Sequence, residues 1–140
     1  MQTNGRTYSL DTNVIIRFLT RDDEALYPKA REIMRGITEG RLTVECDPVI
    51  LAEVVWVLTS FYKRSRTDIS KALAAIVKSD GVLIPHRSRY ILALNIFANT
   101  NAHFGDACAC AAALEDCDGR LFSFDRELSK IEGINRSERP

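Results

Sequence analysis

Apolar residues along this chain gather in short runs, which alternate with longer segments where they recur at helical spacing. The short runs are rich in β-prone residues and predict strands at 7–10 (TYSL), 42–46 (LTVEC), 82–85 (VLIP) and 121–124 (LFSF). The longer segments predict helices at 12–20, 28–40, 48–61, 67–80, 89–100 and 107–116. This alternation predicts an α/β fold, with a mainly parallel sheet covered by helices on both faces.

The length of the chain indicates a single domain. With 140 residues, 46% of them hydrophobic, the chain suits one domain with one core. We expect this domain to span residues 1–134 and the polar sequence NRSERP to form a tail at residues 135–140.

Two patterns that would direct the protein to a membrane are missing from the sequence. No apolar run approaches the roughly 20 residues of a membrane-spanning helix. The N-terminal sequence MQTNGRTYSL also lacks the basic-then-apolar order of a signal peptide. We therefore expect a cytoplasmic protein with no membrane partner.

The first and last predicted strands each stop at an aspartate. Asp11 follows the first strand, and Asp125 follows the last. Either aspartate could cap the helical segment behind it, although Thr12 and Asn13 could cap the first of these equally well. In open α/β sheets, ligands bind outside the carboxyl ends of the strands. The sequence thus predicts a site that contains Asp11 and Asp125.

Glu53 interrupts the apolar stretch VILAEVVWVL, residues 49–58. It lies too far inside its helix to act as a cap, and its neighbours at i±3 and i±4 are apolar: Val49, Ile50, Trp56 and Val57. A helix that is apolar on all sides is normally buried, and an ionised carboxylate is costly to bury without a partner. Glu53 must either reach solvent or face a cation, and the apolar neighbours favour a buried Glu53 that faces a cation.

Asp47 and Asp106 both stand where helices are predicted to begin, but their contexts differ. Asp47 directly precedes Pro48, which is the pattern of an ordinary helix N-cap. Asp106 opens the helix ACACAAALED after the loop NAHFG. It either satisfies the first backbone N–H groups of that helix or belongs to a site. Asp47 is predicted to be structural, and Asp106 is a site candidate.

The candidate acids point to a hard divalent cation. Asp11, Glu53, Asp106 and Asp125 would repel one another if they converged without a counter-charge. Mg²⁺ and Mn²⁺ prefer carboxylate and water oxygens and supply that charge. The two histidines, His86 and His103, are far apart in sequence, which leaves zinc hydrolase chemistry and a Ser-His-Asp triad without support.

The four cysteines have no metal-binding spacing. No CxxC pair occurs, and three of the four fall in one alanine-rich segment. We expect small buried side chains in a reducing compartment, at Cys46, Cys108, Cys110 and Cys117.

With these acids identified, the chain resembles the PIN-domain ribonucleases of the VapC toxin type. The matching segments are LDTNVIIRFL, PVILAEVVWVL, FGDACACAAAL and FSFDREL, in the order and spacing of that family. The likeness runs from Tyr8 to about Ile134. Asn13 and Ser123 match supporting polar residues of the family, and the positions that match its acidic quartet are Asp11, Glu53, Asp106 and Asp125.

The resemblance implies a fold and an activity. The fold would be a four- or five-stranded sheet with an acidic pocket at the carboxyl ends of the strands. The activity would be Mg²⁺- or Mn²⁺-dependent endoribonuclease cleavage that leaves a 5′-phosphate and a 3′-hydroxyl. We expect Asp11, Asp106 and Asp125 to bind one or two metal ions directly or through water. Glu53 is expected either to orient a metal-bound water or to hold the metal ligands in place from outside.

The resemblance also implies partners. Members of the family commonly form homodimers and are blocked by a small antitoxin protein that covers the acidic pocket. The RNA cleaved and the identity of the antitoxin do not follow from the sequence.

An RNA substrate would need local cations beside the acids, because the formal net charge of the chain is zero, with 19 basic and 19 acidic side chains. The cluster YKRSR equally suits a solvated helix end. The candidate RNA-binding residues are Lys63, Arg64, Arg66, Arg87, Arg89 and Arg126.

Two other functions compete with a nuclease. A haloacid-dehalogenase-type phosphohydrolase also begins with a strand ending in Asp, but it needs a second aspartate where this chain has Asn13. A PIN-like domain could also bind RNA or protein without catalysis, since fold does not decide function. A complete acidic quartet argues against that binding module.

Overall fold

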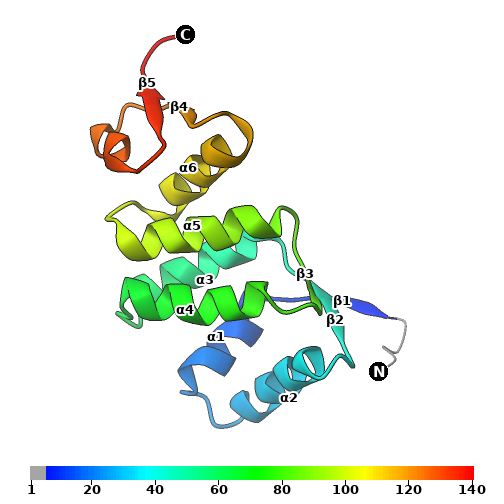
Figure 1. The fold of residues 1–140 in the computed structure, drawn as a ribbon. Coiled ribbons are helices and arrows are strands. Elements are labelled where there is room, and N and C mark those ends of the chain that lie inside the picture. The colour runs from blue at the N-terminus through cyan, green and yellow to red at the C-terminus, as the bar shows by residue number, and fades with distance from the viewer. Residues whose placement is uncertain (1–5) are drawn as a thin grey trace.

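The computed structural model describes residues 6–140 and confirms an α/β fold (Figure 1). The first five residues of the predicted domain lie outside this range. Within it the strands are β1 (Thr7–Ser9), β2 (Thr43–Glu45), β3 (Val82–Leu83), β4 (Arg120–Phe122) and β5 (Asn135–Ser137). The helices are α1 (Thr12–Thr20), α2 (Tyr27–Thr38), α3 (Pro48–Ser60), α4 (Arg66–Val77), α5 (Arg87–Asn99) and α6 (Phe104–Asp116), with the 3₁₀ helix η1 (Arg126–Lys130).

The strands form two separate parallel sheets. β1, β2 and β3 make a three-stranded sheet in that order, with Val44 of β2 opposite Tyr8 of β1 and Val82 of β3. β4 and β5 make a second sheet, in which Leu121 lies opposite Arg136. The expected parallel pairing is confirmed, but the strands of the described chain are divided between two sheets and do not form one of four or five.

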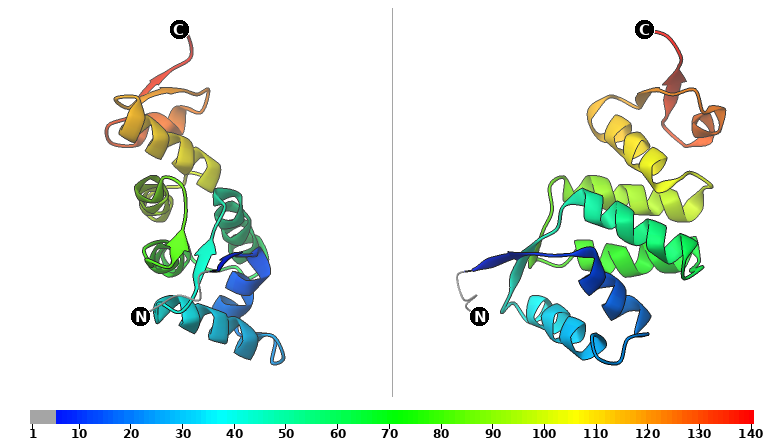
Figure 2. Two further views of the ribbon diagram at one scale, coloured as in Figure 1. Left: turned by 90° about the vertical axis from the view of Figure 1, so that its right-hand side faces the viewer. Right: turned by 180° about the vertical axis from the view of Figure 1, so that it is seen from behind.

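The arrangement of the helices explains this division. α4 and α5 lie on one side of the three-stranded sheet, and α1 and α3 lie on the other (Figure 2). α6 packs against α5 and leads the chain away from that sheet. In every view β4, η1 and β5 lie beyond α6, at the opposite end of the molecule from α2 (Figures 1 and 2). We call residues 120–137 the C-terminal unit.

One apolar core joins the helices to the three-stranded sheet. Val44 and Val82 are almost fully buried between the helix layers, and within residues 6–140 no polar or charged side chain is classed as buried. The largest side chains that this core buries completely are Ile15, Leu51, Ile69, Leu73 and Leu94.

Local signals place most element boundaries. A side-chain oxygen of Asp47 accepts a hydrogen bond from the Val49 N–H at 2.9 Å, which confirms Asp47 as the cap of α3. Ser65 caps α4, because its hydroxyl oxygen accepts a hydrogen bond from the Asp68 N–H. Ser88 lies inside the first turn of α5, and its hydroxyl donates to Glu115.

The last residues are more ordered than their polar composition suggests. Asn135–Ser137, assigned to the tail from sequence, form β5. Nη1 of Arg136 donates to the Ser123 carbonyl oxygen at 2.8 Å, and its Nε donates to the Ser129 hydroxyl. These bonds connect β5 to the segment that carries Asp125.

Candidate active site

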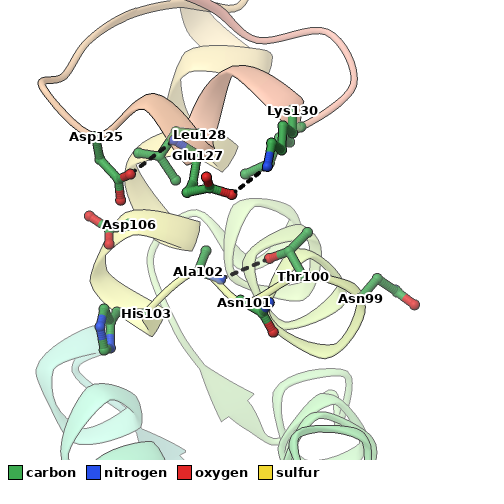
Figure 3. A pocket seen from close by; sticks show the side chains of 11 residues that line it. Asn99, Thr100, Asn101, Ala102, His103, Asp106, Asp125, Glu127, Leu128 and Lys130 are labelled. Carbon is green, nitrogen blue, oxygen red and sulfur yellow. Dashed lines mark hydrogen bonds and ion pairs between the residues drawn. The ribbon is translucent and has the colours of Figure 1, made fainter.

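Two of the predicted acids face each other across a cavity of about 460 Å³ (Figure 3). Asp106 stands in the first turn of α6, and Asp125 stands at the start of η1. We call these two residues the C-terminal acid pair. Polar side chains and the loop between α5 and α6 surround them, and the cavity is lined by Asn99, Thr100, Asn101, Ala102, His103, Asp106, Asp125, Glu127, Leu128, Lys130 and Ile131.

Local hydrogen bonds hold Asp125 in place. Its Oδ1 accepts from the Glu127 N–H at 3.0 Å, so the capping interpretation is also correct. The hydroxyl oxygen of Ser123 accepts from the backbone N–H of Asp125 at 3.0 Å. Ser123 therefore holds the backbone of Asp125 in position.

A buried thiol reports the combined charge of this pair. Cys110 lies one turn along α6 from Asp106 and is 0% exposed. Burial raises the pKa of its thiol, and the carboxylates of Asp106 and Asp125 raise it further. Because both carboxylates act on one thiol, they share a small region of negative potential.

The other two acids lie together where α1 meets α3. Asp11 occupies the N-cap position of α1, yet among the described residues its carboxylate makes no capping hydrogen bond. The hydroxyl of Thr12 donates to Oε2 of Glu53 at 2.6 Å. This bond places Glu53 beside the residue that follows Asp11. We call Asp11 and Glu53 the N-terminal acid pair.

The expectation that Glu53 is buried is wrong. Glu53 is exposed, as are Val49 (63%) and Trp56 (69%), which lie on the same side of α3. The buried side of the helix carries Leu51, Val54, Val55 and Leu58. Solvent stabilises the carboxylate, so the need for a neighbouring cation no longer follows from burial.

The two acid pairs do not combine within one described chain. In residues 6–140 no three or more His, Cys, Asp or Glu side chains are placed to hold a metal ion together. The carboxylates have the right chemistry for Mg²⁺ or Mn²⁺, but Asp106 and Asp125 meet each other without Asp11. The ligand set Asp11, Asp106 and Asp125 therefore does not fit a metal ion in this arrangement.

Three of the six candidate cations have partners inside the protein. The guanidinium of Arg66 donates to the carbonyl oxygens of Phe97, Asn101 and Ala102. Arg87 donates to the Val82 carbonyl oxygen at 2.5 Å, and Arg89 forms ion pairs with Glu115 and Asp116. The remaining candidates, Lys63, Arg64 and Arg126, are exposed.

Sequence reasoning overlooked two polar contributions to these surfaces. Thr12 was considered only as an alternative cap, although its hydroxyl is the group that contacts Glu53. Nζ of Lys130 donates to Oε2 of Glu127 at 2.8 Å and brings a positive charge to the rim of the cavity. Asn13, the other expected supporting residue, is exposed in the first turn of α1.

The cysteines lie outside this chemistry. All four are free thiols. Cys46 and Cys110 are buried and Cys108 is half-buried, but Cys117 is exposed, so the expectation of a buried side chain is wrong at Cys117. Burial raises the pKa of Cys46 and of Cys108 to about 11. The thiols of these two residues are therefore protonated at neutral pH and react poorly.

Comparison with known proteins assigns the fold to a family. The PIN domain matches residues 8–134, which include both acid pairs. None of the curated proteins compared with the chain matches it. No helix within residues 6–140 is long and apolar enough to cross a membrane.

Proposed function

Because the chain belongs to the PIN-domain family, we propose that it is a metal-dependent endoribonuclease and the VapC-type toxin of a toxin–antitoxin pair. PIN domains are generally nucleases and typically use divalent metal ions. The observation that carries the proposal is the C-terminal acid pair, in which Asp106 and Asp125 come from distant segments and face one cavity. Facing carboxylates are costly for stability unless a ligand uses them.

The proposed reaction is hydrolysis of an RNA phosphodiester bond. Water adds to phosphorus, and the bond from phosphorus to the 3′-oxygen breaks, which leaves a 5′-phosphate and a 3′-hydroxyl. This proposal requires the two acid pairs to come together in one reaction centre, where Asp11, Asp106 and Asp125 supply carboxylate oxygens and Glu53 orients the attacking water. Thr12 holds Glu53 in position through its 2.6 Å hydrogen bond.

The RNA would lie on exposed cations next to the acids. Lys63 and Arg64 follow α3, and Arg126 follows Asp125 directly. Their charges offset the repulsion between RNA phosphates and the acid pairs. Arg66, Arg87 and Arg89 would support the RNA-binding surface indirectly, through the loops and helices that they stabilise.

The partners proposed with this function are an antitoxin protein and a second copy of the chain. An antitoxin that covers the acids would stop RNA from reaching them. The proposed place of action is the cytoplasm, where the RNA substrates are found and where the four thiols stay reduced.

A non-catalytic binding module is the second candidate, and one observation favours it. The acids of the described chain stand as two pairs, and neither pair is a complete metal site. A domain that only binds RNA or protein needs no complete site.

Cleavage of a mixed RNA pool separates the two candidates. Purified protein is tested with Mg²⁺, with Mn²⁺ and with EDTA, and Asp106→Asn serves as the inactive variant. Asp47→Asn is the matched control, because it removes the same charge while asparagine still caps α3. Metal-dependent cutting by the wild type and by Asp47→Asn, but not by Asp106→Asn, supports the nuclease proposal. RNA binding without cutting, unchanged in Asp106→Asn, supports the binding module.

A further inference from the structure

Each of the two sheets has an edge strand with an exposed surface. β1 pairs with β2 on one side and β4 pairs with β5 on one side, and no other strand of residues 6–140 pairs with either. All three residues of β1 are exposed. Parallel sheets are normally covered, and a two-stranded sheet is marginally stable alone. Unpaired edges of this kind are templates for pairing with another strand.

Large aromatic side chains accompany both edges. Tyr8 in β1 is 48% exposed, and Phe122 in β4 is 70% exposed. Phe124, directly before Asp125, is 84% exposed. Apolar side chains beside an open edge are typical of a surface that is covered in an assembly.

The C-terminal unit is fixed to its own chain and cannot swing onto its own β1 without breaking packed contacts. Ala107, Cys110 and Ala111 of α6 are 0% exposed where the helix joins the core, and the rings of Phe97 and Phe104 meet edge to face with centroids 6.0 Å apart. These contacts hold α6 against α5.

The connections at both ends of α6 are also tight. Arg66 donates to three carbonyl oxygens of residues 97–102, which holds the loop before α6. After α6 the chain turns at Gly119, with φ of +78°, where a Cβ atom would overlap the Gly133 carbonyl oxygen. Neither connection provides a hinge, so the partner of each open edge must come from another molecule.

The acids are divided in the same way as the edges. In the N-terminal acid pair, Asp11 follows β1 along the chain and Glu53 lies in α3. In the C-terminal acid pair, Asp125 follows β4 and Asp106 lies at the start of α6. We infer that β4 of one copy pairs in parallel with β1 of a second copy, so that each active centre combines the C-terminal acid pair of one chain with the N-terminal acid pair of the other. Parallel pairing is required because Asp11 and Asp125 each follow the carboxyl end of their strand.

Such pairing is reciprocal and closes on itself. Each copy offers one β1 edge and one β4 edge, so a two-fold axis pairs both of these edges. The dimer would contain two composite centres. The catalytic activity of these composite centres rests on the proposed function, whereas the strand pairing between the two copies does not.

Cross-linking between marked chains tests the pairing without any assay of activity. Two variants are co-expressed in a Cys117→Ala background, which removes the exposed native thiol. One carries Tyr8→Cys, the other carries Phe122→Cys and a size tag, and a short bis-maleimide joins thiols that lie close together. Arg31→Cys, on an exposed position of α2, replaces Tyr8→Cys as the control.

We expect a covalent product with the summed mass of both chains for the Tyr8→Cys mixture and not for the Arg31→Cys mixture. The wild type should have the mass of a dimer by light scattering. A linked product of monomer mass in a chain that carries both cysteines would show pairing within one chain and overturn the inference. A monomeric wild type without any linked product would overturn it as well.

Mixing inactive variants tests the composite centres. Asp11→Asn and Asp106→Asn each inactivate every centre when alone, but a mixed dimer has one centre with neither change. Co-refolded in equal amounts, they should recover about a quarter of wild-type cleavage, because half of the dimers are mixed and each has one intact centre. A wild type that never cuts RNA contradicts the proposed function and leaves the cross-linking result unaffected.

Discussion

The hydroxyl of Thr12 donates a 2.6 Å hydrogen bond to the carboxylate of Glu53, 41 residues further along the chain. The bond joins the first residue of α1 to the middle of α3, and it lies next to Asp11. Both helices have buried faces that position these two residues. Glu53 is therefore held by the hydrogen bond and reaches solvent. The sequence had instead suggested a charge enclosed by apolar neighbours.

Replacing Thr12 tests how strongly this bond orients Glu53. Thr12→Val keeps the shape of the side chain and removes the donor, so we expect the free energy of unfolding to fall by about 1 kcal/mol. RNA cleavage should fall about tenfold or more, because a misplaced reacting group is costly in rate. Thr12→Ser, which keeps the hydroxyl, should behave like the wild type in urea unfolding and in cleavage. Equal cleavage by Thr12→Val and Thr12→Ser would contradict the orienting role.

Removing one charge from the C-terminal acid pair should make the protein slightly more stable. In Asp106→Asn the repulsion from Asp125 is lost, and we expect the melting temperature to rise by up to about 4 °C, the shift that about 1 kcal/mol produces in a chain of this size. The gain should shrink at high salt. Asp80→Asn, at an exposed turn before β3, is the matched control and should leave the melting temperature unchanged. A lower melting temperature for Asp106→Asn would show that the carboxylate serves the fold.

Arg66 and its neighbours in the basic cluster should respond differently to substitution. Arg66→Ala removes the donor to three carbonyl oxygens and the cation 4.1 Å from the centre of the Phe97 ring, so the free energy of unfolding should fall by about 2 kcal/mol. Lys63→Ala with Arg64→Ala should change it by less than about 0.5 kcal/mol, since both side chains are exposed. Chemical denaturation of the two variants measures this contrast.

The salt dependence of RNA binding tests the same cluster for function. If Lys63 and Arg64 contact phosphates, the double alanine variant should lower the slope of log affinity against log salt by about 1–2. An unchanged slope would exclude both residues from the RNA interface. Arg31→Ala, on the exposed side of α2, supplies the comparison with a cation outside the cluster.

Much of the fold was predictable because local patterns decide it. The apolar runs that became β1, β2 and β3 are bounded by polar residues, and Asp47 before Pro48 correctly indicated where α3 begins. The separation of β4 from β1 was not predictable, because it depends on how α6 packs against α5. No pattern within a single strand records which other strand will be its neighbour.

The error over Glu53 has a related cause. The apolar residues Val49 and Trp56 were interpreted as a sign of burial, but they lie on the open side of α3. Composition alone does not distinguish the buried face of a helix from an apolar face that is exposed to solvent. Asp11, Asp106 and Asp125 were found from their positions at element ends, and Glu53 was found from its apolar neighbours. The division of these acids into two pairs required the tertiary structure.

The half-buried thiol of Cys108 predicts a loss of stability at alkaline pH. The pKa of Cys108 is raised from 9.0 to about 11 by burial, so the folded state favours the neutral thiol. The stabilisation is fully present below pH 9 and is lost as the pH rises towards 11, because the unfolded chain releases its proton first. Cys108→Ala should therefore lose less stability than the wild type over this interval, by about 1 kcal/mol or more. Urea unfolding at several pH values measures this difference in stability. Parallel curves of unfolding free energy against pH for the two proteins would contradict the raised pKa of Cys108.

The contact of β5 with the Asp125 segment has a consequence for folding. Arg136 holds the carbonyl of Ser123, and Gly119 accepts a hydrogen bond from the Asn135 N–H, so the turn that carries Asp125 is completed by residues near the C-terminus. Before β5 pairs with β4, the helices from α1 to α6 can already pack, but the C-terminal acid pair lacks this support. The chain would thus fold its core before its C-terminal acid pair takes its final arrangement.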